Sequence, residues 1–258
     1  MIRAIIFDLD GTLVQSEKLK ALAYAMAVQR IRGLPEPDQI AIDAYREIVG
    51  ADRNTASRHV MENLGLENEL SPLMSRYGAR EPWEVLTAMR RDIYSGMVAD
   101  PKVLRDNQWP HTVELLRVAK ENACLTALVT MSKRDDVLHT IHSIGIEQSL
   151  DLVLTADDVT RAKPDPEIYL LAAKKLEVPP EECLALEDSV NDVKSALAAG
   201  VNIIAIATPF TSAGLHSSHI IEDTWIVHES NELPDIVRHR IEEHNRTSHQ
   251  DSVKKGGV

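Results

Sequence analysis

Two aspartates follow the first apolar segment of this chain of 258 residues. Residues 2–7 form a short apolar run, Asp8 follows it directly, Asp10 comes two residues later and Gly11 comes next. Side chains at positions i and i+2 of an extended segment point to the same side, and glycine permits a sharp turn after them. Two carboxylates placed in this way can share a proton or hold a cation.

Other polar residues end later apolar runs. Thr130 follows the run at 123–129, and Glu187 with Asp188 follows the run at 183–186. Ligands of open α/β sheets bind at the carboxyl ends of the strands, so these side chains are expected to line a common crevice.

Three carboxylates would crowd this crevice, those of Asp8, Asp10 and Asp188. Their mutual repulsion favours a hard divalent cation with oxygen ligands, and Mg²⁺ is the best fit. Magnesium in turn favours phosphate ligands. Lys163, which is followed by Pro164 in a predicted loop, could offset phosphate charge from the opposite side.

Four ordered segments resemble the motifs of the haloacid dehalogenase-like superfamily. They are residues 8–13 (DLDGTL), Thr130, residues 163–166 (KPDP), and residues 187–189 (EDS) with Asp192. Each motif is short, and the resemblance depends on their order and on their positions at strand ends or in loops. The helical segment after the first strand resembles the cap of the subgroup that contains phosphoglycolate phosphatase and β-phosphoglucomutase. The resemblance implies a Rossmann-like core and phosphoryl transfer from a phosphomonoester.

The resemblance also implies a role for each motif residue. Asp8 would be the nucleophile that forms an aspartyl-phosphate, and Asp10 would be the general acid and then the general base. Thr130 would hydrogen-bond the transferring phosphoryl group, and Lys163 would stabilise its charge. Mg²⁺ would be bound by Asp8, by Asp188 and by the backbone carbonyl of Asp10.

Two further acidic residues, Glu187 and Asp192, are expected to lie behind the metal ligands or to add a ligand. Asp192 also follows Ser189 by three residues, which is the spacing of a helix N-cap with an acidic partner. Both roles remain open for Asp192 at this point.

Three residues are candidates for substrate binding: Arg53, Lys20 and Ser132. Gly50 and Arg53 resemble a cap segment in which phosphoglucomutase-like members bind a second phosphate through an arginine. Lys20 stands where those members usually have histidine, and Gln15 stands where aspartate is common, so these two positions argue against a mutase. Ser132 could contact phosphate or begin a helix.

Alternating apolar runs and helical patterns predict an open α/β sheet. The apolar runs lie at 2–7, 123–129, 152–154, 183–186 and 203–207. Such runs without polar alternation are typical of parallel strands buried on both faces. The helical patterns lie at 113–122, 134–143, 166–176 and 189–199. We therefore expect a Rossmann-like parallel sheet.

Residues 16–96 interrupt this alternation. They contain helical patterns near 16–31, 37–49, 53–64 and 81–95. This predicts an all-helical cap inserted after the first strand, with the core formed by residues 1–15 and 97–244. Residues 245–258 are polar and are expected to be a disordered tail.

Composition argues against several classes of partner. The chain has 28 Lys and Arg against 40 Asp and Glu, a net charge of −12, which argues against binding to nucleic acid. Apolar runs are far shorter than the roughly 18 residues that span a bilayer, so we expect no membrane partner and a cytoplasmic location. The two cysteines lie in apolar runs and are expected to pack in the core.

Together these features predict a magnesium-dependent phosphatase that hydrolyses a small phosphorylated metabolite. Two alternatives remain open. A β-phosphoglucomutase-like enzyme would interconvert phosphosugars, and a non-catalytic protein with this fold would bind a phosphorylated ligand without turnover. The sequence is compatible with a monomer or a homodimer.

Overall fold

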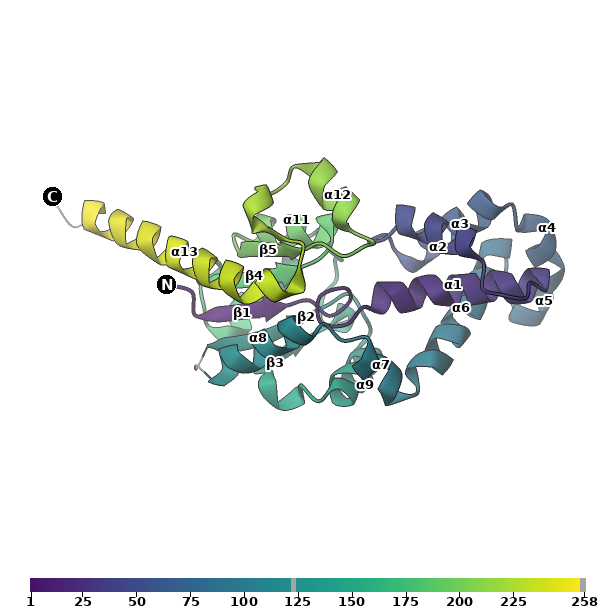
Figure 1. Cartoon of the computed structure of the whole chain (residues 1–258), viewed down its shortest axis with the longest axis horizontal. Coiled ribbons are helices and arrows are strands. Elements are labelled where there is room, and N and C mark those ends of the chain that lie inside the picture. Colours follow the sequence, from purple (N-terminus) through teal and green to yellow (C-terminus); the bar gives the residue numbers. More distant parts are fainter. Residues whose placement is uncertain (122–123, 256–258) are drawn as a thin grey trace. The chain divides into compact units, whose positions relative to one another are not determined.

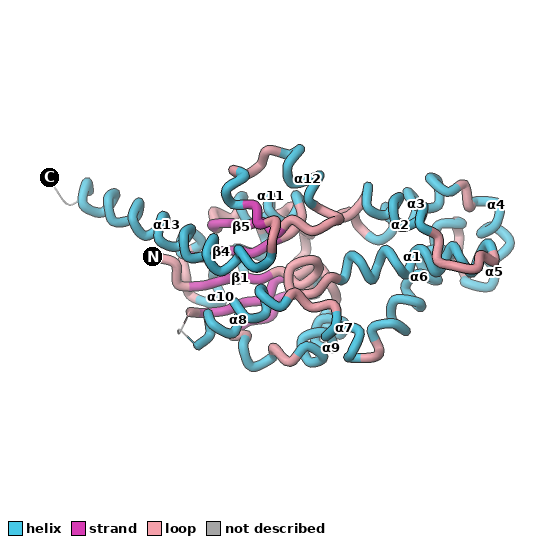
Figure 2. The backbone as a smooth tube through the Cα atoms, viewed as in Figure 1, coloured by secondary structure: helices cyan, strands magenta, loops and turns pink. Residues whose placement is uncertain are grey.

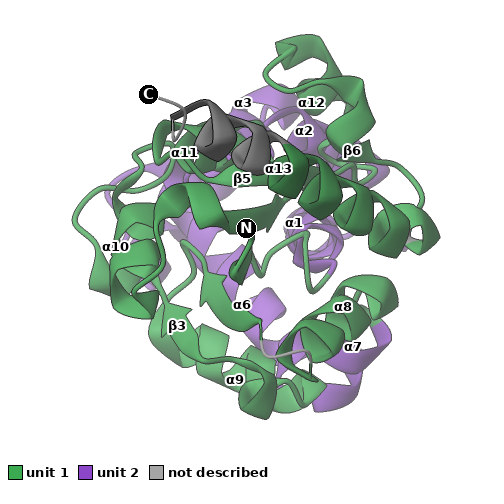
Figure 3. Ribbon diagram, turned by 90° about the vertical axis from the view of Figure 1, so that its left-hand side faces the viewer, with its two compact units in different colours: residues 1–14, 107–258 green, residues 15–106 purple. Residues whose placement is uncertain are grey.

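The computed structural model describes residues 1–121 and 124–255, and the chain divides into two compact units (Figures 1 and 3). The core unit comprises Met1–Val14 and Asn107–Val258, and the helical unit comprises Gln15–Asp106. The core unit is therefore built from two segments that are far apart in the sequence.

The core unit contains a six-stranded parallel sheet with the order β3-β2-β1-β4-β5-β6. Figure 2 shows strands of this sheet in magenta. The strands are β1 (Ala4–Phe7), β2 (Leu125–Val129), β3 (Leu152–Leu154), β4 (Cys183–Glu187), β5 (Asn202–Ile206) and β6 (Ile226–Val227). This confirms the predicted α/β fold class. Each of the five expected strands is present, and β6 is an addition at the edge of the sheet.

Helices cover both faces of this sheet. They are α8 (Pro110–Glu121), α9 (Arg134–Ile144), α10 (Glu167–Leu176), α11 (Val190–Ala198), α12 (Ser212–Ser218) and α13 (Leu233–Lys255). On one face, Ala172 of α10 and Val193 of α11 share a buried cluster with Ala4 and Ile6 of β1. On the other face, α8 packs on β1 and β2, and α13 packs on α8. Both faces of the central strands are thus buried, as their apolar composition requires.

The helical unit is an insertion between β1 and α8. Its α-helices are α1 (Ser16–Arg32), α2 (Gln39–Glu47), α3 (Arg53–Leu64), α4 (Glu67–Leu70), α5 (Met74–Tyr77), α6 (Pro82–Val98) and α7 (Pro101–Asp106). The expected cap ends at 96, but Gly96 lies inside α6 and the unit continues to Asp106. Glycine inside a helix costs only about 1 kcal/mol relative to alanine. The packing of α6 on α1 and α3 outweighs this cost.

Helix α13 begins at Leu233 and continues to Lys255, so the segment at 245–255 is helical where a disordered tail is expected. Leu233 and Val237 are buried and anchor the first turns. Once these turns exist, each further residue adds a hydrogen bond without a new nucleation step. Some residues of the expected elements lie outside the described residues: 122 of the expected helix at 113–122, 123 of the expected second strand, and 256–258 of the expected tail. Within the described part of the chain, no helix is both long and apolar enough to cross a membrane.

Candidate active site

The parallel register brings the ends of three neighbouring strands to one level. Phe7 of β1 pairs with Leu128 of β2 and with Leu186 of β4. The next residues of the three strands therefore lie at one edge of the sheet: Asp8, Val129 and Glu187. The amide of Asp8 donates to the carbonyl of Leu186 over 3.1 Å, which fixes the backbone of this aspartate.

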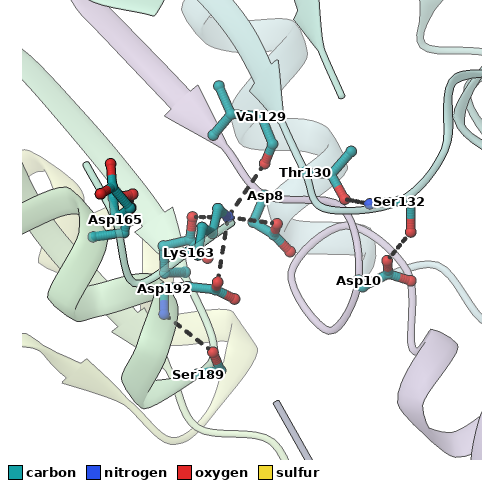
Figure 4. Close-up of polar contacts among 11 residues, drawn as sticks. Asp8, Asp10, Val129, Thr130, Ser132, Lys163, Asp165, Ser189 and Asp192 are labelled. Carbon is teal, nitrogen blue, oxygen red and sulfur yellow. Dashed lines mark hydrogen bonds and ion pairs between the residues drawn. The ribbon is translucent and has the colours of Figure 1, made fainter. Parts of the chain in front are cut away.

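Lys163 reaches this edge from the loop between β3 and α10 (Figure 4). Its Nζ donates to Asp8 Oδ1 over 3.0 Å and to Glu187 Oε1 over 2.9 Å. The same nitrogen lies 3.5 Å from Asp192 Oδ1. The side chain of Lys163 is only 2% exposed, so its donors have to be satisfied by protein groups rather than by bulk water.

Burial and charge shift the pKa values of this cluster. Burial raises the pKa of Asp8 from its ordinary value of 3.8 to about 7, against the lowering effect of Lys163. Burial also raises the pKa of Glu187 well above its ordinary value. Burial by itself would lower the pKa of Lys163, but Asp192, Asp8 and Glu187 together raise it well above its ordinary value. Lys163 is therefore a charged centre among carboxyl groups whose ionisation is disfavoured.

Four carboxylates lie close enough to bind one ion. In a search of the described residues, one oxygen from each of Asp8, Glu187, Asp188 and Asp192 lies within 4.8 Å of the others. Among those residues, Asp8 Oδ2 and Glu187 Oε2 are buried without a hydrogen-bond partner. A set of carboxylate oxygens suits a hard divalent cation, whose charge would offset their burial. The side chain of Asp10 is not part of this group.

Gly11 forms the turn after the two aspartates. Its φ is +87°, and its amide donates to the carbonyl of Val14 over 2.7 Å. A Cβ atom at this position would lie 2.0 Å from Asp188 Oδ2. Glycine is therefore required both by the backbone conformation and by the approach of Asp188 to the turn.

Gly11→Ala is expected to lower the free energy of unfolding by about 2–5 kcal/mol, since left-handed strain and steric overlap add to each other. If the four-carboxylate group holds a divalent cation, the variant should also bind that cation more weakly, because Asp188 has to move. Urea unfolding with and without Mg²⁺ measures both effects. Gly145→Ala is the matched control, since Gly145 has a φ of +69° and open space at its Cβ position. An equal loss of stability in the two variants would contradict the importance of the Asp188 contact.

Thr130, Ser132 and Asp10 form a second group of polar contacts near Asp8 (Figure 4). Thr130 is buried, and its Oγ1 accepts from the amide of Ser132 over 3.1 Å. Ser132 Oγ donates to Asp10 Oδ2 over 2.5 Å. The structure therefore joins a residue expected to bind substrate to the expected acid and base.

Asp192 combines the two roles that its sequence spacing suggests. Its amide donates over 3.3 Å to Oγ of Ser189, which is the N-cap residue of α11. Its carboxylate lies 3.5 Å from Lys163 Nζ and belongs to the four-carboxylate group. The cap uses the backbone of Asp192, so its side chain remains part of the charged cluster.

Arg53 and Lys20, the other residues expected to bind substrate, lie in the helical unit. Arg53 is the exposed first residue of α3, directly after the N-cap residue Asp52. Lys20 Nζ lies 2.6 Å from Glu17 Oε1, and the other oxygen of Glu17 accepts from the hydroxyl of Tyr45. A role for Arg53 and Lys20 in binding substrate stays a prediction.

Tyr169 of α10 is a neighbour of the site that no sequence pattern indicates. Lys163 Nζ lies 5.4 Å from the centroid of the Tyr169 ring, within the range of a cation–π contact. The loop before α10 is held by Ser195 Oγ of α11, which donates to the carbonyl of Asp165 over 2.6 Å. In the sequence, nothing distinguishes Tyr169 from the other apolar residues of its helix. Its contact with Lys163 depends on how α10 packs against the sheet, which the sequence pattern does not show.

Comparisons of the sequence with known proteins place the chain among hydrolases. The sequence model of the haloacid dehalogenase-like hydrolases matches residues 2–200. The phosphorylated carbohydrates phosphatase of Thermotoga maritima is 29% identical over 201 residues, which cover 78% of this chain and 83% of that protein. The phosphoglycolate phosphatase of Salmonella choleraesuis is 30% identical over 203 residues, which cover 77% of this chain and 79% of that protein.

A solved structure shows the same fold. The β-phosphoglucomutase of Clostridium difficile superposes with a TM-score of 0.67 over 95% of this chain and 99% of that chain, at 20% identity. The family match, the relatives and the four motifs, three at strand ends and one in the loop before α10, all agree. This chain belongs to the haloacid dehalogenase-like hydrolase family.

Proposed function

We propose that this protein is a phosphatase that hydrolyses a small phosphorylated metabolite, with Asp8 as the nucleophile. The proposal depends on the different surroundings of the two oxygens of the Asp8 carboxyl group. Its Oδ1 is bonded to Lys163, and its Oδ2 is buried without a hydrogen-bond partner among the described residues. One oxygen is therefore held while the other is available for chemistry. The two relatives described above are named as phosphatases, which supports the same reaction here.

The reaction proceeds in two steps. In the first, an oxygen of Asp8 attacks phosphorus, the bond from phosphorus to the substrate oxygen breaks, and Asp10 gives its proton to that oxygen. In the second, Asp10 takes a proton from water as the water attacks phosphorus. The bond from phosphorus to the Asp8 oxygen breaks, which restores the Asp8 carboxylate and releases inorganic phosphate. Lys163 and Thr130 stabilise the charge on the transferring group.

A divalent cation would be held by Asp8, Asp188 and the backbone carbonyl of Asp10. Oxygen ligands and a phosphate substrate both favour Mg²⁺. When bound, the ion supplies positive charge that offsets the repulsion between the substrate phosphate and the carboxylates. Glu187 and Asp192 complete the acidic surroundings, and Lys163 keeps Glu187 in place through their 2.9 Å contact.

Mg²⁺ affinity is expected to fall about tenfold between about pH 8 and about pH 6, because protons compete with the ion for Asp8. The expectation follows from the pKa of Asp8, which burial raises to about 7. In the protein without metal, the folded state binds this proton more tightly than the unfolded state. Protonation of Asp8 therefore adds to the free energy of unfolding in full below pH 3.8, the ordinary pKa of the group. This contribution is lost as the pH rises through about 7. Calorimetric titration with MgCl₂ and thermal unfolding measure the two effects.

Asp8→Asn is the control for this pH dependence. The variant lacks the titrating carboxyl, so its Mg²⁺ affinity should change less between the same two pH values. An affinity of the native protein that is equal at both pH values would contradict the competition.

Release of inorganic phosphate from sugar phosphates, phosphoglycolate and nucleotides, with Mg²⁺ or with EDTA, tests the function itself. Mg²⁺-dependent release supports the proposal, and no release from any substrate contradicts it. Interconversion of positional isomers of a hexose phosphate, with a bisphosphate present, would instead identify a mutase. The KM values of Arg53→Ala and Lys20→Ala on the best substrate test whether these side chains bind it.

A further inference from the structure

The hydroxyl of Ser132 is directed at the carboxyl of Asp10 (Figure 4). Ser132 Oγ donates to Asp10 Oδ2 over 2.5 Å, at the short end of the range for a hydroxyl that donates to a carboxylate. When Asp10 is ionised, as it is before it takes a proton from water, a bond of this kind is about twice as strong as a neutral one. The bond therefore restrains the orientation of the Asp10 carboxyl.

The backbones on both sides of this bond are held in place. The amide of Ser132 donates to Thr130 Oγ1 over 3.1 Å, and the carbonyl of Ser132 accepts from the amide of Ala156 over 3.2 Å. Asp10 directly precedes Gly11, whose amide donates to the carbonyl of Val14 over 2.7 Å and closes the turn. Two separately fixed loops of the core unit thus present the hydroxyl and the carboxyl to each other.

Asp10 differs from the other acidic residues of the site. Among the described residues, its side chain is not one of the four carboxylates that lie within reach of a common ion. Lys163 orients Asp8 and Glu187 directly, through contacts of 3.0 Å and 2.9 Å. Ser132 makes the corresponding contact to Asp10. A group that transfers a proton has to be held in the productive geometry, because a small misplacement lowers the rate strongly.

We propose that Ser132 is a positioning residue for Asp10 rather than a residue that binds substrate. Its hydroxyl holds Oδ2 so that the carboxyl is oriented for proton transfer to the leaving oxygen and, in the second step, from water. The inference rests on the proposed function, in which Asp10 is the acid and the base. Ser132 acts through Asp10 and does not touch the reacting atoms.

The identity of the leaving group reveals such a role. An alkoxide is a strong base and requires a proton as it departs, whereas a nitrophenolate leaves readily without one. A misoriented Asp10 therefore slows an alkyl phosphate more than nitrophenyl phosphate. Loss of a serine that binds the phosphate of the substrate would slow both in the same proportion.

Ser132→Ala is expected to lower the ratio of kcat/KM for an alkyl phosphate to kcat/KM for nitrophenyl phosphate by about 10–100-fold. This is part of the roughly 10²–10⁴-fold that a positioned acid or base contributes. The quantity kcat/KM is informative because it compares the transition state with free enzyme and substrate. Steady-state kinetics with saturating Mg²⁺ measures it for both substrates.

Three further variants sharpen the experiment. Ser132→Thr keeps the hydroxyl and should restore most of the ratio. Ser132→Cys keeps the side-chain size with a weaker donor, so it should give an intermediate ratio even if the alanine variant does not fold. Ser218→Ala is the matched control, because it removes a hydroxyl that donates to the carbonyl of Leu215 in α12. The control should leave the ratio unchanged.

A double-mutant cycle with Asp10→Asn separates positioning from general damage. If Ser132 acts through Asp10, Ser132→Ala should have no further effect on the ratio in the Asp10→Asn background. Equal losses for both substrates, or a ratio effect that persists without Asp10, would overturn the inference and leave the phosphatase function intact. Absence of phosphate release by the native protein would instead refute the proposed function, and this inference with it.

Discussion

Asp8→Asn is expected to reduce Mg²⁺-dependent phosphate release by about 10⁴-fold or more, because an amide cannot form the aspartyl-phosphate. The fold should persist. The amide oxygen can still accept from Lys163, which also contacts Glu187 and Asp192. The substitution also removes a carboxyl whose ionisation burial disfavours. Initial rates measure the loss of activity, and protein-bound phosphate after acid quenching measures the loss of the intermediate.

Asp136→Asn is the matched control for this variant. Asp136 is an exposed aspartate of α9, and its replacement should leave phosphate release unchanged. Circular dichroism melting should show that both variants remain folded. Turnover by Asp8→Asn at the native rate would exclude Asp8 as the nucleophile, whatever the substrate.

Lys163→Met is expected to lower the free energy of unfolding by about 3–5 kcal/mol, because breaking a buried ion pair leaves uncompensated charge. The side chains of its partners Asp8 and Glu187 are 4% and 0% exposed, so water cannot replace the ammonium. Phosphate release should also be abolished, because in the proposed mechanism Lys163 stabilises the charge of the transferring group. Urea unfolding and initial rates measure the two effects.

Two comparisons make this prediction specific. Lys175→Met removes an exposed lysine of α10 and should leave stability nearly unchanged. Adding Glu187→Gln to Lys163→Met should return part of the lost stability, because it removes one of the buried acidic partners. The stability that Lys163→Met loses relative to the native protein should become smaller as the pH falls, because the carboxyl groups of Asp8 and Glu187 can then take up protons. Equal urea midpoints for Lys163→Met and the native protein would contradict the argument.

The strands of the core could be predicted because their burial is visible in the chain. Residues 2–7 predict β1 because an apolar run of this length suits a strand covered on both faces. Strand β6 has only the two residues Ile226–Val227, which is too short for any periodic pattern. It forms because β5 offers an open edge, where Ala205 pairs with Ile226. The cap expected to end at 96 continues to Asp106 in the structure, because Gly96 lies inside α6, which packs on α1 and α3.

Ser132 shows where prediction from the sequence reaches its limit. A serine just beyond a phosphate-binding motif is compatible with a substrate contact, a helix start or a contact within the protein. The structure directs its hydroxyl at Asp10, which is 122 positions away in the chain. No local pattern encodes that distance, because it depends on how β1 and β2 pair and on how both following loops turn.

The order of amino acids alone indicates which groups are available for chemistry in this protein. Asp8, Asp10 and Asp188 are recognisable because they follow buried apolar runs, and both the burial of a run and the residue that ends it are local properties. The pairing and the charge of these groups depend instead on the folded chain. Lys163 meets Asp8 across 155 positions and Glu187 across 24, and the pKa of Asp8 rises to about 7 only because the folded core excludes water from it. Desolvation and charge pairing depend on distance in space, and the fold sets that distance.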